Sequence, residues 1–205
     1  TVTSAIDASL APIGDPRLLI SAEGNLLFNA QVGASSRLSG FDSLATGRFQ
    51  LEPDAQIRTF GEIRLGGNAG FANQALASLP LDPGDSRWLI WSGNPTPFSA
   101  EGGDSLGSLV HDFRYYDLSL AQIQADEQAL LPNELPPSGN GLLYAIAPTL
   151  ALVSDQPIIK VYDGTDAASL AAYGIGLSGT IEGDVATLST GTVRFDRSDV
   201  FATTL

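Results

Sequence analysis

The chain has 205 residues, of which 43% are hydrophobic, and this content predicts a folded protein and excludes an intrinsically disordered one. Its 10 basic and 23 acidic residues give a net charge of −13, which disfavours nucleic acid and anionic lipid as partners because both are negatively charged. There is no cysteine, so disulfides, thiolate metal sites and cysteine nucleophiles are excluded.

No run of apolar residues approaches the ~20 that a membrane-spanning helix needs. The longest, between Leu142 and Val153, is short and contains Pro148. We therefore expect no membrane insertion. Thr1 opens the chain without Met or a basic leader, so we expect a piece that was cut or processed from a longer protein.

The first part of the chain, up to residue 80, contains short stretches in which apolar and polar side chains alternate. Such alternation predicts strands that bury one face and expose the other. We expect five of these strands, at Arg17–Ala22, Asn25–Val32, Arg48–Leu51, Gln56–Phe60 and Glu62–Leu65. Strands this short, separated by Gly and Asp, favour a solenoid in which each strand is one side of a coil. An open antiparallel sheet is the alternative.

The next stretch holds both tryptophans of the chain. Leu79–Asp85 contains two prolines and is predicted to be a rigid connector. Arg87–Ser92 follows as the most apolar strand, with Trp88 and Trp91 three positions apart. Since residues at odd and even positions of a strand face opposite ways, we expect one tryptophan in the core and the other exposed.

We expect residues 101–141 to form an excursion that caps the open end of the solenoid, after which the chain rejoins it near residue 140. A last coil without a cap would leave apolar side chains and backbone groups bare. Val110–Tyr116 is predicted to be a strand. Residues 118–131 have the Ala, Gln and Glu content of a short helix, with Asp117 or Ser119 as its N-cap.

From Pro148 onwards the pattern changes to that of a small all-β module. Asp-Gly, Glu-Gly-Asp and Thr-Gly turns separate predicted strands at Thr149–Val153, Ile158–Tyr162, Gly174–Ser178, Val185–Ser189 and Thr192–Phe195. We therefore divide the chain into a first domain, residues 1–147, and a partial β module, residues 148–205. A module this short has a thin core, so we expect the complete one to continue further.

Three passages carry motifs that occur together in a known family. Leu27–Leu38 and Gln56–Gly66 read as strands joined by Val-Gly-Ala-Ser or ending in Leu-Gly. Arg87–Pro95 is continued by Asn140–Leu150 after the excursion. Lys160–Ala168 contains Tyr-Asp-Gly and is followed by Leu-Ser-Gly, Glu-Gly-Asp and Val-Ala-Thr-Leu-Ser. Together they resemble two-partner-secretion adhesins of the filamentous-haemagglutinin type, at the end of the β-helix and the start of a Tyr-Asp-Gly (YDG) repeat module.

The resemblance covers most of the chain except residues 101–139. It implies a mostly-β protein, with the last coils and cap of a right-handed parallel β-helix followed by the small module. It also implies export through an outer-membrane transporter, a secreted or cell-surface location, and adhesion to other cells, a host or a biofilm matrix. It implies no catalytic residue and no cofactor.

His111 is the only histidine of the chain, and its neighbours include Asp112, Arg114 and Tyr116. The set is similar to the acid/base groups of polysaccharide-active β-helix enzymes. Neighbouring residues of a strand point to opposite faces, so we expect these groups not to converge. Four carboxylates could offer oxygen ligands to calcium: Glu101, Asp104, Asp112 and Asp117. No Asp-x-Asp-x-Asp-Gly loop is present, so we expect solvated carboxylates and no metal site.

The candidate ligand-binding residues are aromatic, because an exposed ring can stack on a sugar. They are Trp88, Trp91, Tyr115 and Tyr116, and core packing is the alternative for each. For Tyr162-Asp163-Gly164 we predict a structural turn, in which Asp163 accepts hydrogen bonds from neighbouring backbone amides.

The sequence therefore predicts a structural and adhesive segment, a stalk and joint that projects a binding tip, with no catalytic activity. Two alternatives remain open. A polysaccharide-active β-helix enzyme would have a groove with paired carboxylates ~5–9.5 Å apart. A carbohydrate-binding module would have exposed aromatic platforms without acid/base groups.

Overall fold

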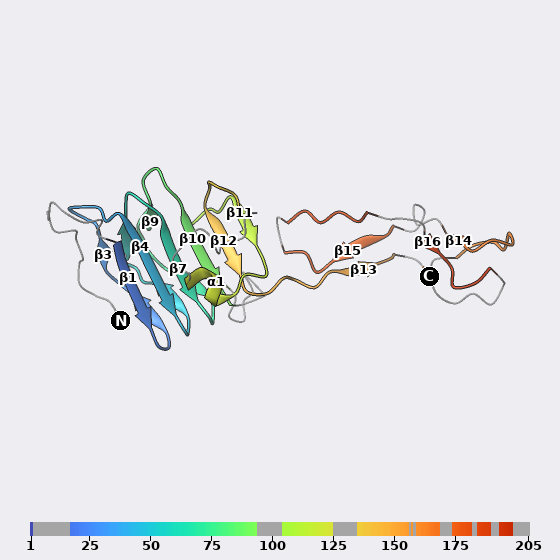
Figure 1. Ribbon diagram of the computed structural model, residues 1–205, viewed down its shortest axis with the longest axis horizontal. Helices are drawn as coiled ribbons and strands as arrows, with labels where there is room; N and C mark the ends of the chain where they lie inside the picture. The colour runs from blue at the N-terminus through green and yellow to red at the C-terminus, as the bar shows by residue number, and fades with distance from the viewer. Residues whose placement is uncertain are drawn as a thin grey trace. The chain divides into compact units, whose positions relative to one another are not determined.

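The computed structural model describes residues 1, 17–93, 104–124, 135–155, 157, 159–168, 174–181, 184–189 and 193–198. The chain divides into two compact units, Thr1–Ala147 and Pro148–Leu205, each with its own sheets. Strands make up nearly all of the regular structure in both (Figure 1). None of the described helical segments has the length and apolar character that a membrane crossing requires.

The first unit is a β-solenoid of about three turns, built from three parallel sheets. The largest sheet contains, in spatial order, β1 (Arg17–Ala22), β4 (Gly40–Ala45), β7 (Ile63–Gly67), β10 (Trp88–Ser92), β12 (Gly141–Tyr144) and β11 (Phe113–Tyr115). The second sheet contains β2 (Leu26–Phe28), β5 (Phe49–Leu51) and β8 (Phe71–Asn73), and the third contains β3 (Gln31–Val32), β6 (Gln56–Arg58) and β9 (Leu81–Asp82). All of these strand pairs are parallel, which confirms the predicted β-helix and excludes the antiparallel sheet.

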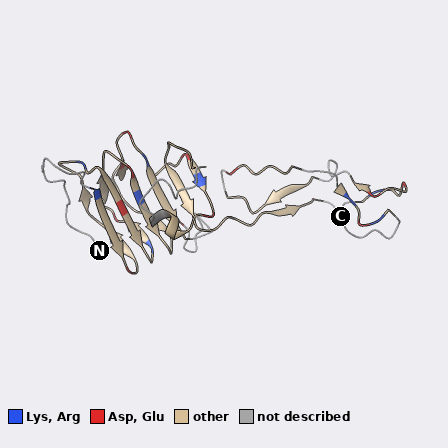
Figure 2. Ribbon diagram, in the orientation of Figure 1, with Lys and Arg blue, Asp and Glu red and all other residues tan. Residues whose placement is uncertain are grey.

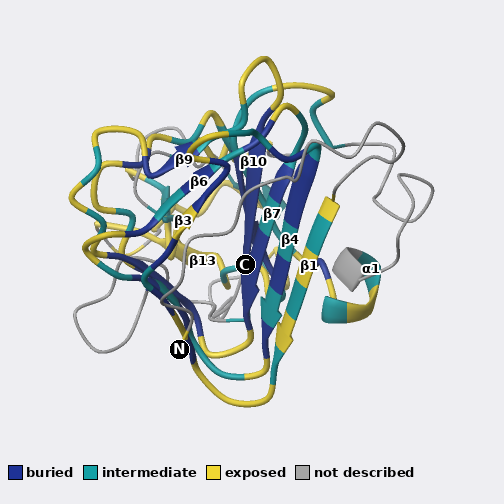
Figure 3. Ribbon diagram, turned by 90° about the vertical axis from the view of Figure 1, so that its left-hand side faces the viewer, coloured by how far each residue is buried: buried dark blue, intermediate teal, exposed yellow. Residues whose placement is uncertain are grey.

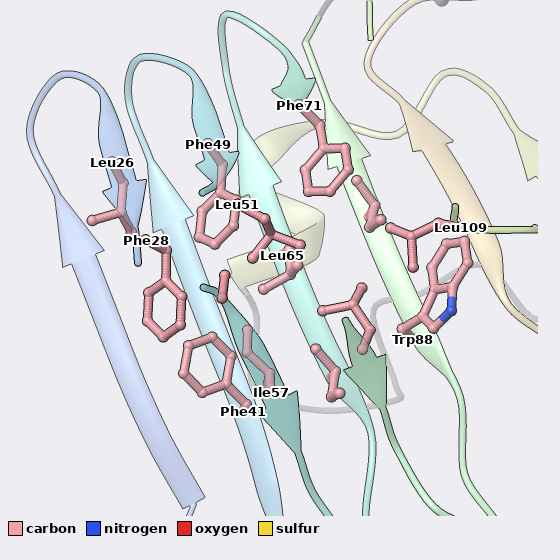
Figure 4. Close-up of a cluster of buried hydrophobic side chains, with 14 of the residues drawn as sticks. Leu26, Phe28, Phe41, Phe49, Leu51, Ile57, Leu65, Phe71, Trp88 and Leu109 are labelled. Carbon is pink, nitrogen blue, oxygen red and sulfur yellow. The ribbon is translucent and has the colours of Figure 1, made fainter. Parts of the chain in front are cut away.

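The core of the solenoid lies between the three sheets and is rich in phenylalanine (Figure 4). The rings of Phe49 and Phe71 stack in successive coils with centroids 6.1 Å apart, and Phe28 lies 6.3 Å from Phe49 on the other side. Burial alternates as predicted, because Phe49 and Leu51 are buried while Gln50 between them is half-buried. The corresponding strands of successive coils stack behind one another (Figure 3), so each coil is covered mainly by the coils before and after it.

Several strands differ from the prediction because the chain turns a corner within a coil. The predicted strand Asn25–Val32 is divided into β2 and β3, and at the corner Asn29 Oδ1 accepts a hydrogen bond from the Asp54 amide of the next coil. The predicted connector Leu79–Asp85 contains β9, because its two prolines flank the strand and leave its ladder intact. Strands β4 and β8 were not predicted.

The excursion after β10 both continues the solenoid and departs from it. Ser105 pairs with Ala72 of β8, so the second sheet gains a position beyond its third strand. The predicted helix begins at Leu120 and is described as α1 (Leu120–Gln124), while residues 125–134 lie outside the described residues. Ser119 is its cap: the Gln122 amide donates to Ser119 Oγ, and the Ser119 amide donates to Gln122 Oε1.

The second unit contains two small antiparallel sheets. Strand β13 (Ala151–Val153) pairs with β15 (Gly176–Ser178), and β14 (Ala167–Ala168) pairs with β16 (Val193–Arg194). Three of the predicted strands are therefore present in shortened form. The described residues of the other two, at Ile158–Tyr162 and Val185–Ser189, are not in strands.

Gly33 occupies a turn where only glycine fits. Its φ is +69°, and a Cβ would collide with the Arg58 carbonyl oxygen of the next coil. Gly24 also has a positive φ, +88°, but has open space around it. We expect Gly24→Ala to cost about 1–2 kcal/mol from backbone strain alone, and Gly33→Ala at least about 1 kcal/mol more from the clash. Urea unfolding of both variants measures the difference, and equal losses would contradict the clash.

Candidate functional site

The four aromatic candidates gather where β10, β12 and β11 lie side by side at the end of the solenoid. Trp88 faces the core and Trp91 faces outward, as the strand alternation predicts. The expected exposure of one ring is wrong, because Trp88 is 3% and Trp91 1% exposed. In this structure neither indole offers a face on which a ligand can stack.

Trp91 is covered by the chain that follows β11. Its Nε1 donates a hydrogen bond of 2.7 Å to the Leu118 carbonyl oxygen, and the Leu118 amide donates one of 3.0 Å to the Tyr144 carbonyl oxygen. Leu118 thus packs on Leu89, Trp91 and Leu143 to form a small second core on the outer face of the sheet. Asp117, with φ of 67°, turns the chain into this position.

The two tyrosines are half-buried and also pack against the sheet. The Tyr116 ring stacks on Tyr144 with centroids 5.5 Å apart. Tyr115 lies beside Leu143 in the strand register and packs against the outer core. The structure therefore brings the four candidates together, but through packing, and Tyr115 and Tyr116 keep only part of their surface in solvent.

The remaining candidates are the acid/base groups around His111 and the carboxylates considered for calcium. His111 is half-buried, and Asp112 Oδ2 accepts a hydrogen bond from the Asn140 amide. Among the described residues, no group of three His, Cys, Asp or Glu side chains is placed to hold a metal ion. Glu101 lies outside the described residues.

Asp104 is buried and links two strands of the solenoid, β8 and β10. Its Oδ1 accepts hydrogen bonds from the Phe71 amide at 2.8 Å and from Ser92 Oγ at 3.0 Å. Burial raises the pKa of Asp104 above its usual value, although these two hydrogen bonds and the positive charge of Arg48 oppose the rise. Its contacts assign it a structural role between β8 and β10.

Ion pairs connect successive coils, and charges of both signs lie along the strands (Figure 2). Glu62 receives hydrogen bonds from Arg64 Nε at 2.5 Å and Arg87 Nε at 2.6 Å. Arg37 Nη1 donates to the carbonyl oxygens of Thr59 and Asp82, so one side chain spans three coils. The hydrogen bond from Arg37 is the main reason why the pKa of Asp82 is lowered.

In the second unit, Asp163 organises a turn. Its Oδ1 accepts hydrogen bonds from the Thr165 amide at 2.9 Å and Thr165 Oγ1 at 2.8 Å, which confirms the predicted structural role. Lys160 Nζ lies 2.7 Å from Asp163 Oδ1 and also donates to the Ala167 carbonyl oxygen. Gly164, with φ of +77°, completes the turn.

We expect Asp163 to titrate at a pKa of about 2, well below the ordinary 3.8, chiefly because of the hydrogen bond from Lys160. Because the folded-state pKa is depressed, stabilisation by the charged carboxylate is present above the unfolded-state pKa and is lost as the pH falls towards 2. Lys160→Gln should raise the pKa towards its ordinary value, whereas Lys160→Arg should keep it low. Carboxyl NMR titration measures this, and an unchanged pKa in Lys160→Gln would contradict the assignment.

The turn lies in the passage that carries the Tyr-Asp-Gly motif. Residues 147–204 match the YDG domain. The second unit is therefore a YDG module, as the sequence predicts. No curated protein and no solved structure matches the chain.

The YDG module exposes many apolar side chains, and none of its described residues is buried. Large apolar side chains that are substantially exposed are Leu150, Leu152, Val153, Ile159, Val161, Tyr162, Val185 and Leu188. Among them, Val161 and Val185 are 89% and 90% exposed. Exposed apolar groups gathered in one module mark a contact surface more often than scattered single residues do.

Sequence reasoning missed two features of the site. Leu118 was predicted only as part of a helix, although its backbone and side chain cover Trp91. No sequence signal indicates this contact, which joins residues 27 positions apart. Arg37 and Asp82 are 45 positions apart, which is about twice the length of one coil. Their pairing could have been predicted only if the length of a coil had been known.

Proposed function

We propose that this chain is a structural and adhesive segment of a secreted bacterial surface adhesin. One observation carries the proposal: a β-solenoid is followed in the same polypeptide by a YDG module. Stacked coils give length with contacts mainly between neighbouring coils, which suits a spacer. The exposed apolar side chains of the module suit contact with another surface.

Export and partners form part of the same proposal. The resemblance to two-partner-secretion adhesins supports an outer-membrane transporter as the partner during export. The absence of cysteine supports passage of an unfolded chain, because no premature disulfide can form. At the cell surface, the partner is a polysaccharide of the matrix or another cell, and the net charge of −13 disfavours nucleic acid.

Immunolabelling of the source bacterium tests the location. Antibodies raised against the purified chain should label intact cells or the culture supernatant, and treatment of intact cells with protease should remove the surface signal. Labelling that appears only after the cells are permeabilised would overturn the proposal.

Bead adhesion tests the binding role. Beads coated with the chain should attach to bacterial cells, host cells or biofilm matrix more strongly than uncoated beads. The double variant Val161→Asp, Val185→Asp should weaken attachment, because both side chains are almost fully exposed and their replacement removes apolar contact surface at little cost to folding. Attachment equal to that of uncoated beads would overturn adhesion by this segment.

We also propose that the segment acts without catalysis. Incubation with a panel of bacterial and host polysaccharides should release no reducing ends and no unsaturated products. Product formation that Asp112→Asn or His111→Ala abolishes would instead establish the polysaccharide-active enzyme.

A further inference from the structure

Strand β12 lies between two strands that precede it in the chain. The order of the large sheet follows the sequence through β1, β4, β7 and β10, but β12 then comes before β11. On one side, Leu89–Ser92 pair with Gly141–Tyr144, and on the other, Phe113–Tyr115 pair with Gly141–Leu143. Both ladders are parallel, so β12 is inserted between β10 and β11, two strands that come earlier in the sequence. We call this position the slot for β12.

Both faces of β12 are covered as well. Leu142 and Tyr144 belong to the solenoid core, while Leu143 packs outward with Trp91 and Leu118. All four residues of β12 are buried. At Gly141 a Cβ would press on the Phe113 ring and on Leu89, so the strand fits closely between its two neighbours.

The opposite end of the sheet is held differently. Strand β1 pairs with β4 only, among the described strands, and its inward side chains Leu18 and Ile20 are half-buried. Removing β1 would break one ladder, whereas removing β12 breaks two ladders and exposes two apolar clusters. The two ends of the solenoid therefore resist extraction of a strand to different extents.

We propose that β12 is a mechanical anchor, clasped between β10 and β11, that passes tension from the YDG module into the solenoid. Strand β12 is the last strand of the first unit, and the YDG module begins three residues after it. Along the polypeptide, tension on the module therefore enters the solenoid at β12. The inference rests on the proposed function, in which the chain is a segment that bears tension between a cell and its target.

Single-molecule force spectroscopy on the full chain tests the anchor. Because the chain has no cysteine, Asp54→Cys in the exposed turn before β6 gives a unique attachment point, and the C-terminus gives the other. Pulling should first unfold the YDG module, which has no buried residue among those described. Release of β12 should follow at higher force. Because β12 is the only ladder partner of β11 among the described strands, β11 should be freed with it, and the chain should lengthen by roughly 130 Å, the extended length of residues 106–144.

Two matched variants separate anchoring from general stability. Leu142→Ala in β12 and Leu65→Ala in β7 each remove a core leucine, with exposures of 0% and 1%. Both should lower stability in urea to a similar extent. At constant force, only Leu142→Ala should accelerate the release of β12, by at least about tenfold. Gly141→Ala, which disturbs the fit against Phe113, should act like Leu142→Ala and provides a second variant.

The outcomes are distinct. Release of β12 at or below the force that unfolds the YDG module would overturn the anchor, and so would equal acceleration by Leu142→Ala and Leu65→Ala. The purified chain gives these results wherever it is located in the cell. A failure of immunolabelling at the cell surface would overturn the proposed function, whereas a failure here would overturn only the anchor.

Discussion

Phe49→Ala is expected to destabilise the solenoid by about 3–5 kcal/mol, as buried phenylalanines do when they are truncated. Phe49 is fully buried and lies between Phe28 and Phe71, its counterparts in the aromatic stack. The cavity would be bounded by rings of adjacent coils, which parallel strands hold in place. A loss of this size is a large fraction of the ~5–15 kcal/mol that stabilises an ordinary domain. Urea unfolding followed by far-UV circular dichroism measures it.

Phe60→Ala is the matched control for that result. Phe60 is 71% exposed, and the Arg37 guanidinium lies 5.9 Å from its ring centroid. We expect a loss of at most about 1 kcal/mol, the usual contribution of an exposed cation–π pair. Similar losses in Phe49→Ala and Phe60→Ala would mean that the phenylalanine stack does not stabilise the coils.

The second large effect is expected at Glu62. Glu62→Gln removes the negative charge between Arg64 and Arg87, and Arg87 is itself only 9% exposed. A buried arginine without its counter-charge is costly, so we expect a loss of about 2–3 kcal/mol at pH 7. Glu23→Gln in an exposed turn is the control, with an expected change within about 0.5 kcal/mol. Equal urea midpoints for Glu62→Gln and the unmodified chain would exclude a stabilising role for the ion pairs of Glu62 with Arg64 and Arg87.

The effect of Glu62 should depend on pH. Burial alone would raise the pKa of Glu62, but the hydrogen bonds and charges of Arg64 and Arg87 outweigh burial and hold the pKa below its usual 4.5. A depressed folded-state pKa gives stabilisation that is complete above the unfolded-state pKa and is lost as the pH falls through the folded value. The difference between the unmodified chain and Glu62→Gln should therefore shrink below about pH 4.5. A difference that stays constant down to pH 3 would contradict this assignment.

The class of fold could be predicted from the sequence because it depends on local alternation. Phe49, Leu51 and Ile57 are buried and their neighbours are not, and this pattern is visible without any contact between coils. Strand β4 escaped prediction because Asp42 lies in its middle, and only ion pairs with neighbouring coils, to Arg17 before it and Arg64 after it, account for that residue. Strand β12 shows no alternation, because both of its faces are buried, and its uninterrupted apolar run is what indicates a strand there.

The candidate site was less predictable because burial of the tryptophans depends on a distant segment. Alternation gives Trp88 and Trp91 opposite faces but cannot show that Leu118 covers the outer one. The turn at Asp163 was easier, because its main partners, Lys160 and Thr165, are within five residues of each other. Local contacts were therefore predicted, and contacts one coil or more away were not.

The position of the two tryptophans has a consequence for spectroscopy. Both belong to β10, the strand that forms one wall of the slot for β12. Tryptophan fluorescence therefore reports on β10 and the strands that pack against it, while far-UV circular dichroism averages over every strand. In a denaturant titration, once the dichroism change of the YDG module is subtracted, a fluorescence transition that lags behind the remaining dichroism would mean that the solenoid unwinds from β1 towards β10. The unmodified chain thus carries its own probe of the direction in which its coils come apart.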